Sequence, residues 1–336
     1  MKIEKKILII PLLFILFSGF LYYQDVILYG ALQAKGQILI LLKARPIATY
    51  LDDADYPDSL KLRIQQIQQI KAYSEKIGLK PTNNYTSLYD QKNKASLWNL
   101  SACHPYKFEN KIWSFPFLGS FGYKGFFDLS QAQIEREYLE KEGYDTRIRS
   151  VNAWSTLGWF KDPILSNMLN NTEAQIAETL FHELTHNTLF LKNQLQFIEN
   201  LASFFGKKAS IDYLNFFYGL DAEQMTDYLS DLEDSEKFRQ HLLRGKQSLE
   251  VLYQSFGDAD DLNFKAAKKN KTIRIIVNHL DTIQFRNINY YSIFNKSLPN
   301  NTYFMSYTRY YAEEHKLDSI FNYYEKDLKK FINHFK

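Results

Sequence analysis

The sequence contains a single cysteine, Cys103, among its 336 residues. One cysteine cannot form an intrachain disulfide, and it cannot supply a cluster of thiolate ligands. Any metal site that this chain builds alone must therefore use histidine and carboxylate side chains. Glycine and proline are also scarce, at 13 and 8 residues. This scarcity excludes collagen-like and low-complexity chains, and the absence of a repeat of roughly 20–50 residues excludes a solenoid.

A strong excess of one charge is absent as well. The chain has 41 basic and 38 acidic residues, which gives a formal net charge of +3. We therefore expect no nucleic-acid partner, and we interpret the basic cluster between Lys265 and Arg274 as a solvated helix face. By contrast, 45% of the residues are hydrophobic and 16% are aromatic. Such a composition can fill a substantial core, which excludes wholesale disorder.

The N-terminus has the features of a membrane address. Three lysines precede an uncharged run of 17 residues, Ile7–Tyr23. A spanning helix tolerates roughly 17 residues, whereas the apolar part of a secretory signal has roughly 7–15. Phe17 stands where a cleavage site needs a small side chain. We therefore predict an uncleaved signal anchor over residues 1–24, with a cleaved signal as the alternative, and an extracytoplasmic location for the chain that follows.

The remaining residues predict one predominantly helical α+β domain, 25–336. Apolar residues between Leu60 and Ile70 fall on one helical stripe, and Gly78 is placed to end that helix. Aromatic runs broken by glycines predict short strands from Trp113 onward. A helix is expected over Gln131–Glu142, and a strand follows it up to Phe160.

Helical patterning dominates the second half of the chain. It returns after Thr172, covers Asp221–Gln254 and continues through the last 40 residues. The predicted division of the domain is a helical N-terminal part (25–112), a catalytic core (113–215) and a helical C-terminal part (216–336).

The chemistry is concentrated on the helix that Thr172 and Gln175 should start as a capping box. His182, Glu183 and His186 form the pattern H-E-x-x-H on that helix. Side chains four residues apart differ by only about 40° around a helix, so both imidazoles can bind one metal ion. Glu183 is then placed to accept a proton from a water molecule that the ion activates. The alternative is a pair of histidines hydrogen-bonded in a helical core.

A catalytic zinc site needs a third protein ligand. Lys192 stands six residues after His186, where the longer pattern H-E-x-x-H-x-x-G-x-x-H requires a histidine, so that class is excluded. Glu199 is the better candidate because a second helix, from about Gln194, would present it together with the small Ala202. The pattern E-x-x-A after H-E-x-x-H marks zinc peptidases with two histidines and one glutamate as ligands.

The sequence resembles the bacterial predicted-aminopeptidase family, a group of exported zinc peptidases. The resemblance covers most of the chain after Tyr23. The segments that carry it are GQILILLKARPI (36–47), GYKGFFD (122–128), NAWSTLGWFKDP (152–163), FHELTH (181–186), FIENLASF (197–204) and, more loosely, LPNNTYFMSYTRY (298–310). It implies a zincin-like core with a small sheet before the active-site helix, Zn²⁺ bound by His182, His186 and Glu199, and Glu183 as the general base.

Several residues depart from the pattern of this family. Phe20 stands where many relatives have a lipoprotein cysteine, and Ile198 stands where the family commonly has asparagine. Ser203 replaces an aspartate that orients a histidine ligand in the best-known peptidases of this class, so the orienting group is unidentified. Tyr310, which aligns loosely with a tyrosine of the family, is the candidate oxyanion donor. Lys124 is a weaker candidate for holding a substrate carboxylate.

The expected function is zinc-dependent hydrolysis of peptide bonds by a peptidase anchored in a bacterial inner membrane, on its extracytoplasmic side. Aminopeptidase action is implied by the resemblance alone, because no motif in the sequence binds a free α-amino group. Two alternatives stay open. One is a zinc endopeptidase of the same chemistry, and the other is a non-catalytic, membrane-tethered protein that binds peptides.

Overall fold

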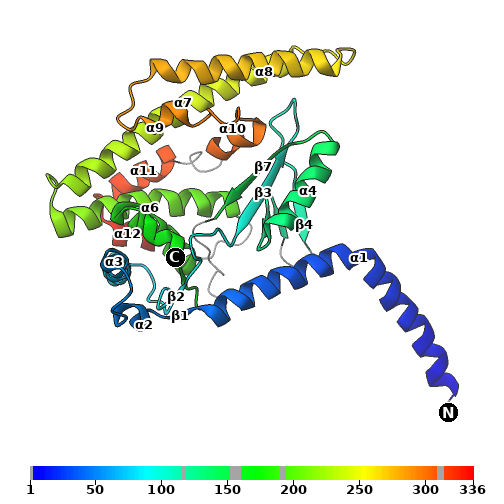
Figure 1. Cartoon of the computed structure of the whole chain (residues 1–336), viewed down its shortest axis with the longest axis horizontal. Coiled ribbons are helices and arrows are strands. Elements are labelled where there is room, and N and C mark those ends of the chain that lie inside the picture. The colour runs from blue at the N-terminus through cyan, green and yellow to red at the C-terminus, as the bar shows by residue number, and fades with distance from the viewer. Residues whose placement is uncertain (1–2, 116–118, 152–159, 190–193, 309–313) are drawn as a thin grey trace.

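The structure is a computed structural model, and it describes residues 3–115, 119–151, 160–189, 194–308 and 314–336. The protein is predominantly helical, with small sheets (Figure 1). The helices are α1 (Ile3–Lys43), α2 (Ile47–Leu51), α3 (Asp58–Lys76), α4 (Leu129–Lys141), α5 (Glu173–Thr188), α6 (Leu195–Tyr218), α7 (Glu223–Gln254), α8 (Leu262–Asn278), α9 (Asn289–Ser292), α10 (Asn301–Thr308), α11 (Glu314–Tyr323) and α12 (Leu328–Asn333), with 3₁₀ turns at Ser166–Asn170 and His279–Thr282.

The strands are short and form three small sheets. They are β1 (Arg45–Pro46), β2 (Ser87–Tyr89), β3 (Trp98–Cys103), β4 (Trp113–Phe115), β5 (Gly119–Phe121), β6 (Lys124–Phe126), β7 (Asp145–Ser150) and β8 (Ile164–Leu165). One sheet has the order β1-β2-β8, with β2 and β8 parallel. The second is antiparallel with the order β6-β3-β7, and β4 pairs with β5. Because β3 pairs with β6 and β7, this sheet joins the parts that the sequence divided at residue 112.

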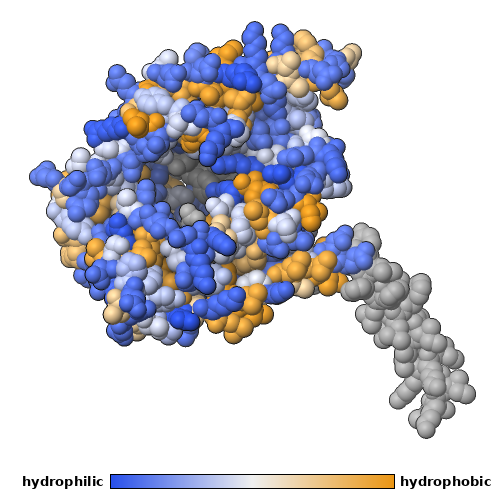
Figure 2. All heavy atoms as spheres, viewed as in Figure 1, coloured by the Kyte–Doolittle hydropathy of each residue, from blue (hydrophilic) through white to orange (hydrophobic). Residues whose placement is uncertain are grey.

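Helix α1 contains the predicted anchor and continues without interruption past residue 24. Among the described residues, Tyr23–Lys43 is long and apolar enough to cross a membrane by length and composition, properties that signal sequences and core helices share. Figure 2 shows apolar side chains on the surface of this segment. Leu28 and Leu42, both within it, are exposed. The predicted boundary at residue 24 is therefore not a boundary between secondary-structure elements.

The same segment also packs against the domain. The hydroxyl of Tyr29 donates a hydrogen bond to the carbonyl of Gly125 at 2.8 Å. A Cβ atom at Gly36 would overlap the side chain of Phe127, so only glycine allows this approach. Ile40 is 4% exposed. The C-terminal half of α1 is consequently part of the folded domain.

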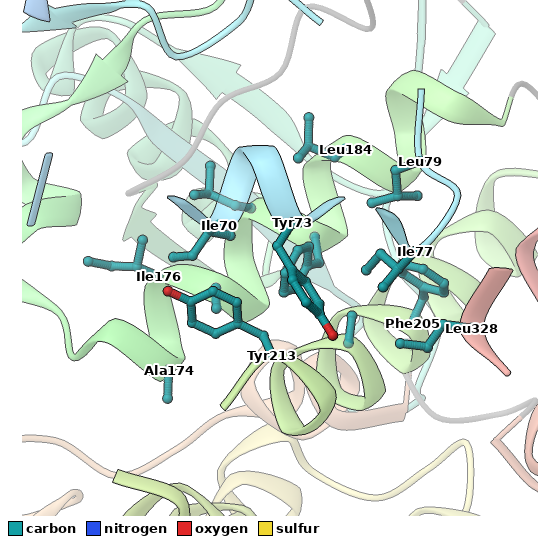
Figure 3. Packing of buried hydrophobic residues seen from close by; sticks show 14 of the residues in the cluster. Ile70, Tyr73, Ile77, Leu79, Ala174, Ile176, Leu184, Phe205, Tyr213 and Leu328 are labelled. Atoms are coloured by element: carbon teal, nitrogen blue, oxygen red, sulfur yellow. The ribbon is translucent and has the colours of Figure 1, made fainter. Parts of the chain in front are cut away.

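The main core surrounds helix α5, which lies between α3 and α6. Ile70 and Tyr73 of α3 meet Ile176 and Leu184 of α5 and Tyr213 of α6 in one buried cluster (Figure 3). The stripe that predicted α3 is this buried face. Gly78, with φ of +94°, follows the end of α3 as expected.

A buried carboxylate fixes the first turn of α5. Glu173 is 6% exposed, and it accepts hydrogen bonds from Tyr213 (2.6 Å), Tyr218 (2.7 Å) and the amide of Gln66 (2.6 Å). Three donors compensate for removing this charge from water. The start of α5 is thereby held to both α3 and α6.

Most other sequence expectations on secondary structure are confirmed. The helix expected over Gln131–Glu142 is α4, and the helix expected over Asp221–Gln254 is α7. The strand expected up to Phe160 is present as β7, which ends at Ser150, and its expected continuation over 152–159 lies outside the described residues. The C-terminal residues form short helices, α10 to α12, as predicted.

Candidate metal centre

Helix α5 begins where the sequence predicted. The hydroxyl of Thr172 accepts a hydrogen bond from the backbone N–H of Gln175 at 3.3 Å, and the Gln175 side chain accepts one from the backbone N–H of Thr172 at 3.2 Å. Leu180 and Leu184 are fully buried in the main core. Packing of this apolar side turns the H-E-x-x-H side of α5 toward the first half of α6.

Two small residues allow α6 to approach α5 closely. Ala202 is fully buried, as the sequence predicted. Gly206, one turn further along α6, was not predicted: a Cβ atom there would lie 2.8 Å from the carbonyl oxygen of Glu178 and 3.5 Å from Cβ of His182. Glu199 lies two turns before Gly206 on the same face of α6, because seven residues complete almost two turns. The close crossing therefore carries Glu199 to the histidines.

The three predicted ligands come together. Nε2 of His182 lies 3.1 Å from Nε2 of His186, and each of these atoms lies 3.6 Å from one carboxylate oxygen of Glu199. At bond lengths of about 2.0–2.1 Å, the ligand atoms of a tetrahedral zinc site are separated by about 3.3 Å. The observed triangle fits that spacing, so these residues could hold a metal ion.

Burial and charge give the two histidines opposite protonation tendencies. The side chains of His182, His186 and Glu199 are 20%, 8% and 25% exposed. Burial lowers the pKa of His186 to about 4, although the charge of Glu199 opposes this effect. Burial also acts to lower the pKa of His182, but its hydrogen bond to Glu199 and the nearby Glu183 outweigh burial and raise it. The neutral form is therefore favoured for His186, and the protonated form for His182.

Glu183 has the character of a proton acceptor. Burial raises the pKa of its carboxyl group to about 7, with His182 acting to lower it and Glu199 to raise it further. A carboxyl group near its pKa at neutral pH can both accept and return a proton. Glu183, next to His182 in the sequence, therefore changes its protonation state near neutral pH.

Ser203 lies at the ring of His182, where the sequence left the orienting group unidentified. Its hydroxyl lies 3.3 Å from Nδ1 of His182, the ring nitrogen that does not face Glu199. A hydrogen bond at this nitrogen fixes the orientation and tautomer of a histidine ligand. The sequence held a signal, since Ser203 occupies the position of the missing aspartate. The serine side chain is one bond shorter than that of aspartate, so its contact with His182 depends on the distance between the two helices.

Two buried residues near Glu183 carried no signal in the sequence. Asp162 is 1% exposed, and its carboxylate also raises the pKa of Glu183. Tyr85 is 2% exposed, and burial together with Glu183 and Asp162 raises the pKa of its hydroxyl well above the usual value. Its φ of +60° is unusual for a residue other than glycine. These residues enter the site through loops, where spacing along the chain gives no guidance.

Two further candidates came from the sequence. Tyr310, the predicted oxyanion donor, lies outside the described residues. Lys124 lies on β6, where its ammonium group is 2.9 Å from the carboxylate of Glu135 and over the ring of Tyr29. Its charge is therefore already paired, which leaves it poorly suited to hold a substrate carboxylate.

A comparison with protein families identifies the family of this chain. The model of the family described as "Putative aminopeptidase" matches residues 28–336. The chain belongs to this family. The match confirms the family resemblance on which part of the sequence interpretation rested. An aminopeptidase is a peptidase, so the family description implies a hydrolase. No curated protein and no solved structure matches the chain.

Proposed function

We propose that this protein is a zinc-dependent peptidase, an aminopeptidase by its family, with a zincin-like core. The observation that carries the proposal is the meeting of His182, His186 and Glu199 within 4.8 Å of one another, with Glu183 adjacent. A structural zinc site has four protein ligands and no need of a neighbouring acid–base group, whereas a catalytic site has three and leaves one position open. The described ligand set has three.

The residues of the chain divide the chemistry among them. Zinc, when bound, would supply Lewis-acid activation of water and of the scissile carbonyl. His182, His186 and Glu199 hold it, and Ser203 fixes the ring of His182. Glu183 takes the proton of the attacking water and passes it to the nitrogen of the leaving group, as its raised pKa allows. Peptide and water together balance the products, a carboxylic acid and an amine.

The location of the enzyme is also a proposal. The uncharged run Ile7–Tyr23 lies within α1 behind three lysines, and Tyr23–Lys43, the part of α1 that follows this run, passes the length and composition criteria for a membrane span. Lysines on the N-terminal side favour retention of that end in the cytoplasm. We therefore propose an anchored enzyme whose domain lies on the extracytoplasmic side of a bacterial inner membrane.

Two substitutions test the catalytic assignment. The full chain is purified in detergent, and bound metal and peptide hydrolysis are measured for each variant. Glu183→Gln should retain zinc while hydrolysis falls by roughly 10²–10⁴-fold, because only the general base is removed. His182→Ala should lose both zinc and activity. Glu250→Gln on α7, which removes a carboxylate paired with Lys246, is the matched control and should change neither.

The result that would overturn the proposal is hydrolysis by Glu183→Gln at the rate of the unaltered protein. Peptides with free and with acetylated N-termini then separate the two modes of cleavage. An aminopeptidase should cleave only the free peptides, whereas an endopeptidase should cleave both. A protein that binds zinc and peptides but hydrolyses neither set would be the non-catalytic alternative.

A further inference from the structure

The guanidinium group of Arg147 is a half-buried cation without an acidic partner in the described part of the chain. It lies on β7, at one edge of the β6-β3-β7 sheet. Its carbon Cζ is 4.3 Å from the centre of the Tyr303 ring, and its Nη1 donates one long hydrogen bond, 3.5 Å, to the hydroxyl of Ser306. Burial lowers the pKa of Arg147. One contact leaves most of its five N–H donors unused.

Two other cations near this sheet, the buried Lys269 and the partly buried Lys124, are paired with carboxylates. Lys269 lies 2.6 Å from the carboxylate of Asp145, and Lys124 lies 2.9 Å from that of Glu135. Buried charges in proteins normally have such partners, because removing a charge from water is costly. Arg147 departs from this rule on the same strand as Asp145. A planar guanidinium with unused donors is suited to a carboxylate, which it can bind through two parallel hydrogen bonds.

The surroundings of Arg147 supply further donors on a fixed support. The hydroxyls of Tyr303 and Tyr307 lie 3.4 Å apart on α10, so their mutual contact uses only one of their two protons, whereas the hydroxyl of Ser306 already donates to the carbonyl of Tyr303 at 2.6 Å. Helix α10 is tied to β7, because the side-chain amide of Asn300 donates to the carbonyl of Thr146 at 2.8 Å. The hydroxyls are therefore held against the strand before any ligand binds.

The arrangement of the elements places this cluster toward the middle of the molecule. In Figure 1, β7 and α10 lie side by side, and α6, which carries Glu199, lies below them. A bound peptide that extends from the candidate metal centre toward β7 would bring its carboxylates to Arg147.

We propose that Arg147, with the hydroxyl of Tyr303, binds a carboxylate of the peptide substrate. The inference rests on the proposed peptidase function and adds a substrate class to it, peptides that carry a carboxylate away from the cleaved bond. That carboxylate has two sources, the free C-terminus of a short peptide and the side chain of an acidic residue. Arg147 is thus a residue that determines specificity, and it takes no part in the proton transfers of Glu183.

Binding without turnover tests the proposal directly. The full-length Glu183→Gln protein, loaded with zinc in detergent, is titrated with one peptide that ends in a carboxylate or in an amide. A second pair of peptides carries glutamate or glutamine within the chain. The carboxylate form of one pair should bind roughly 10–100-fold more tightly, the range expected for hydrogen bonds between charged groups. The pair that shows the difference identifies the source of the carboxylate.

Substitution of Arg147 should remove that preference. In Arg147→Gln the ratio of the two affinities should fall to about one, and in Arg147→Lys it should be intermediate, since lysine keeps the charge but not the planar fork. Arg149→Gln is the matched control, because it removes an exposed arginine from the same strand and should keep the ratio. Thermal unfolding verifies that each variant is folded, and Arg147→Lys carries the test if Arg147→Gln does not fold.

Equal binding of both forms in both pairs, or an unchanged ratio in Arg147→Gln, would overturn the proposal. Absence of binding to any of the peptides would do the same. These outcomes are separate from those of the catalytic test, because hydrolysis by the protein with intact Glu183 is measured independently. A zinc peptidase that ignores carboxylates would retain the proposed function and lose only this inference.

Discussion

Gly206→Ala should weaken metal binding although residue 206 contacts no metal. The added Cβ would lie 2.8 Å from the backbone carbonyl oxygen of Glu178, whereas an ordinary contact needs at least 3.4 Å. The obstacle is backbone, so it cannot rotate aside as a side chain would. Helix α6 must therefore move away from α5 by about 0.6 Å, the difference between these two distances, or one helix must deform.

The size of this movement decides the expected effect. Metal–ligand distances tolerate deviations of about 0.2 Å, so a shift of this size on the helix that carries Glu199 should reduce zinc affinity by at least ~10-fold. The effect on folding should be smaller. Overpacking costs about 1–3 kcal/mol, and replacing a helical glycine with alanine returns about 1 kcal/mol. The free energy of unfolding should consequently fall by only about 0–2 kcal/mol.

Zinc affinity is measured by competition with a chelator, and stability by denaturant unfolding of the metal-free protein. Gly245→Ala in α7 is the matched control, because its Cβ would meet the side chain of Ile276 at 2.7 Å. Ile276 belongs to a second hydrophobic cluster, formed with Phe238 and Leu242 of α7, and not to the candidate ligands. The control should alter stability and leave zinc affinity unchanged. If Gly206→Ala folds and binds zinc as tightly as the unaltered protein, the close approach of α5 and α6 does not position Glu199 and the reasoning is wrong.

Two further predictions concern the histidines. Ser203→Ala should lower zinc affinity by roughly 10–100-fold, because it removes the hydroxyl 3.3 Å from Nδ1 of His182; an unchanged affinity would show that the hydroxyl does not orient the ring. Zinc binding should also weaken as the pH falls from 8 to 5. The raised pKa of His182 and the pKa of Glu183 near 7 mean that the metal must displace protons in this range, whereas His186 stays neutral down to a pH of about 4. Calorimetry in buffers of different ionisation enthalpy should show fewer released protons for Glu183→Gln, and a flat pH profile would contradict the assignment.

The parts of the site that the sequence predicted are those with a local or periodic signal. A capping box fixed the start of α5, and spacing of four residues placed His182 and His186 on one face. The third ligand needed more than periodicity, because Glu199 lies on another helix. Its prediction rested on a known spacing between H-E-x-x-H and a later glutamate. The distances of 3.6 Å from its carboxylate oxygens to both histidine rings agree with the predicted proximity.

The parts that the sequence missed depend on tertiary packing. In the sequence, Gly206 is only a glycine that lowers the stability of a helix. Its role becomes visible in the structure, where a Cβ atom at this position would lie 2.8 Å from the carbonyl oxygen of Glu178. Tyr85 and Asp162 reach Glu183 from segments about 100 and 20 residues before it, through irregular backbone without periodicity. That Arg147 has no acidic partner among the described residues could not be predicted either, because an arginine in a strand is ordinarily solvated or paired.

The two unpredicted features of α6 depend on each other. A serine hydroxyl is one bond closer to its backbone than the oxygen of an aspartate, so Ser203 can reach His182 only if the helices are close. Gly206, three residues later on the same face, permits that approach. If this is the reason for the glycine, Gly206→Ala should break the contact between Ser203 and His182 as well as displace Glu199. Adding Ser203→Ala to Gly206→Ala should then lower zinc affinity by much less than Ser203→Ala does alone, whereas independent roles would make the two losses add.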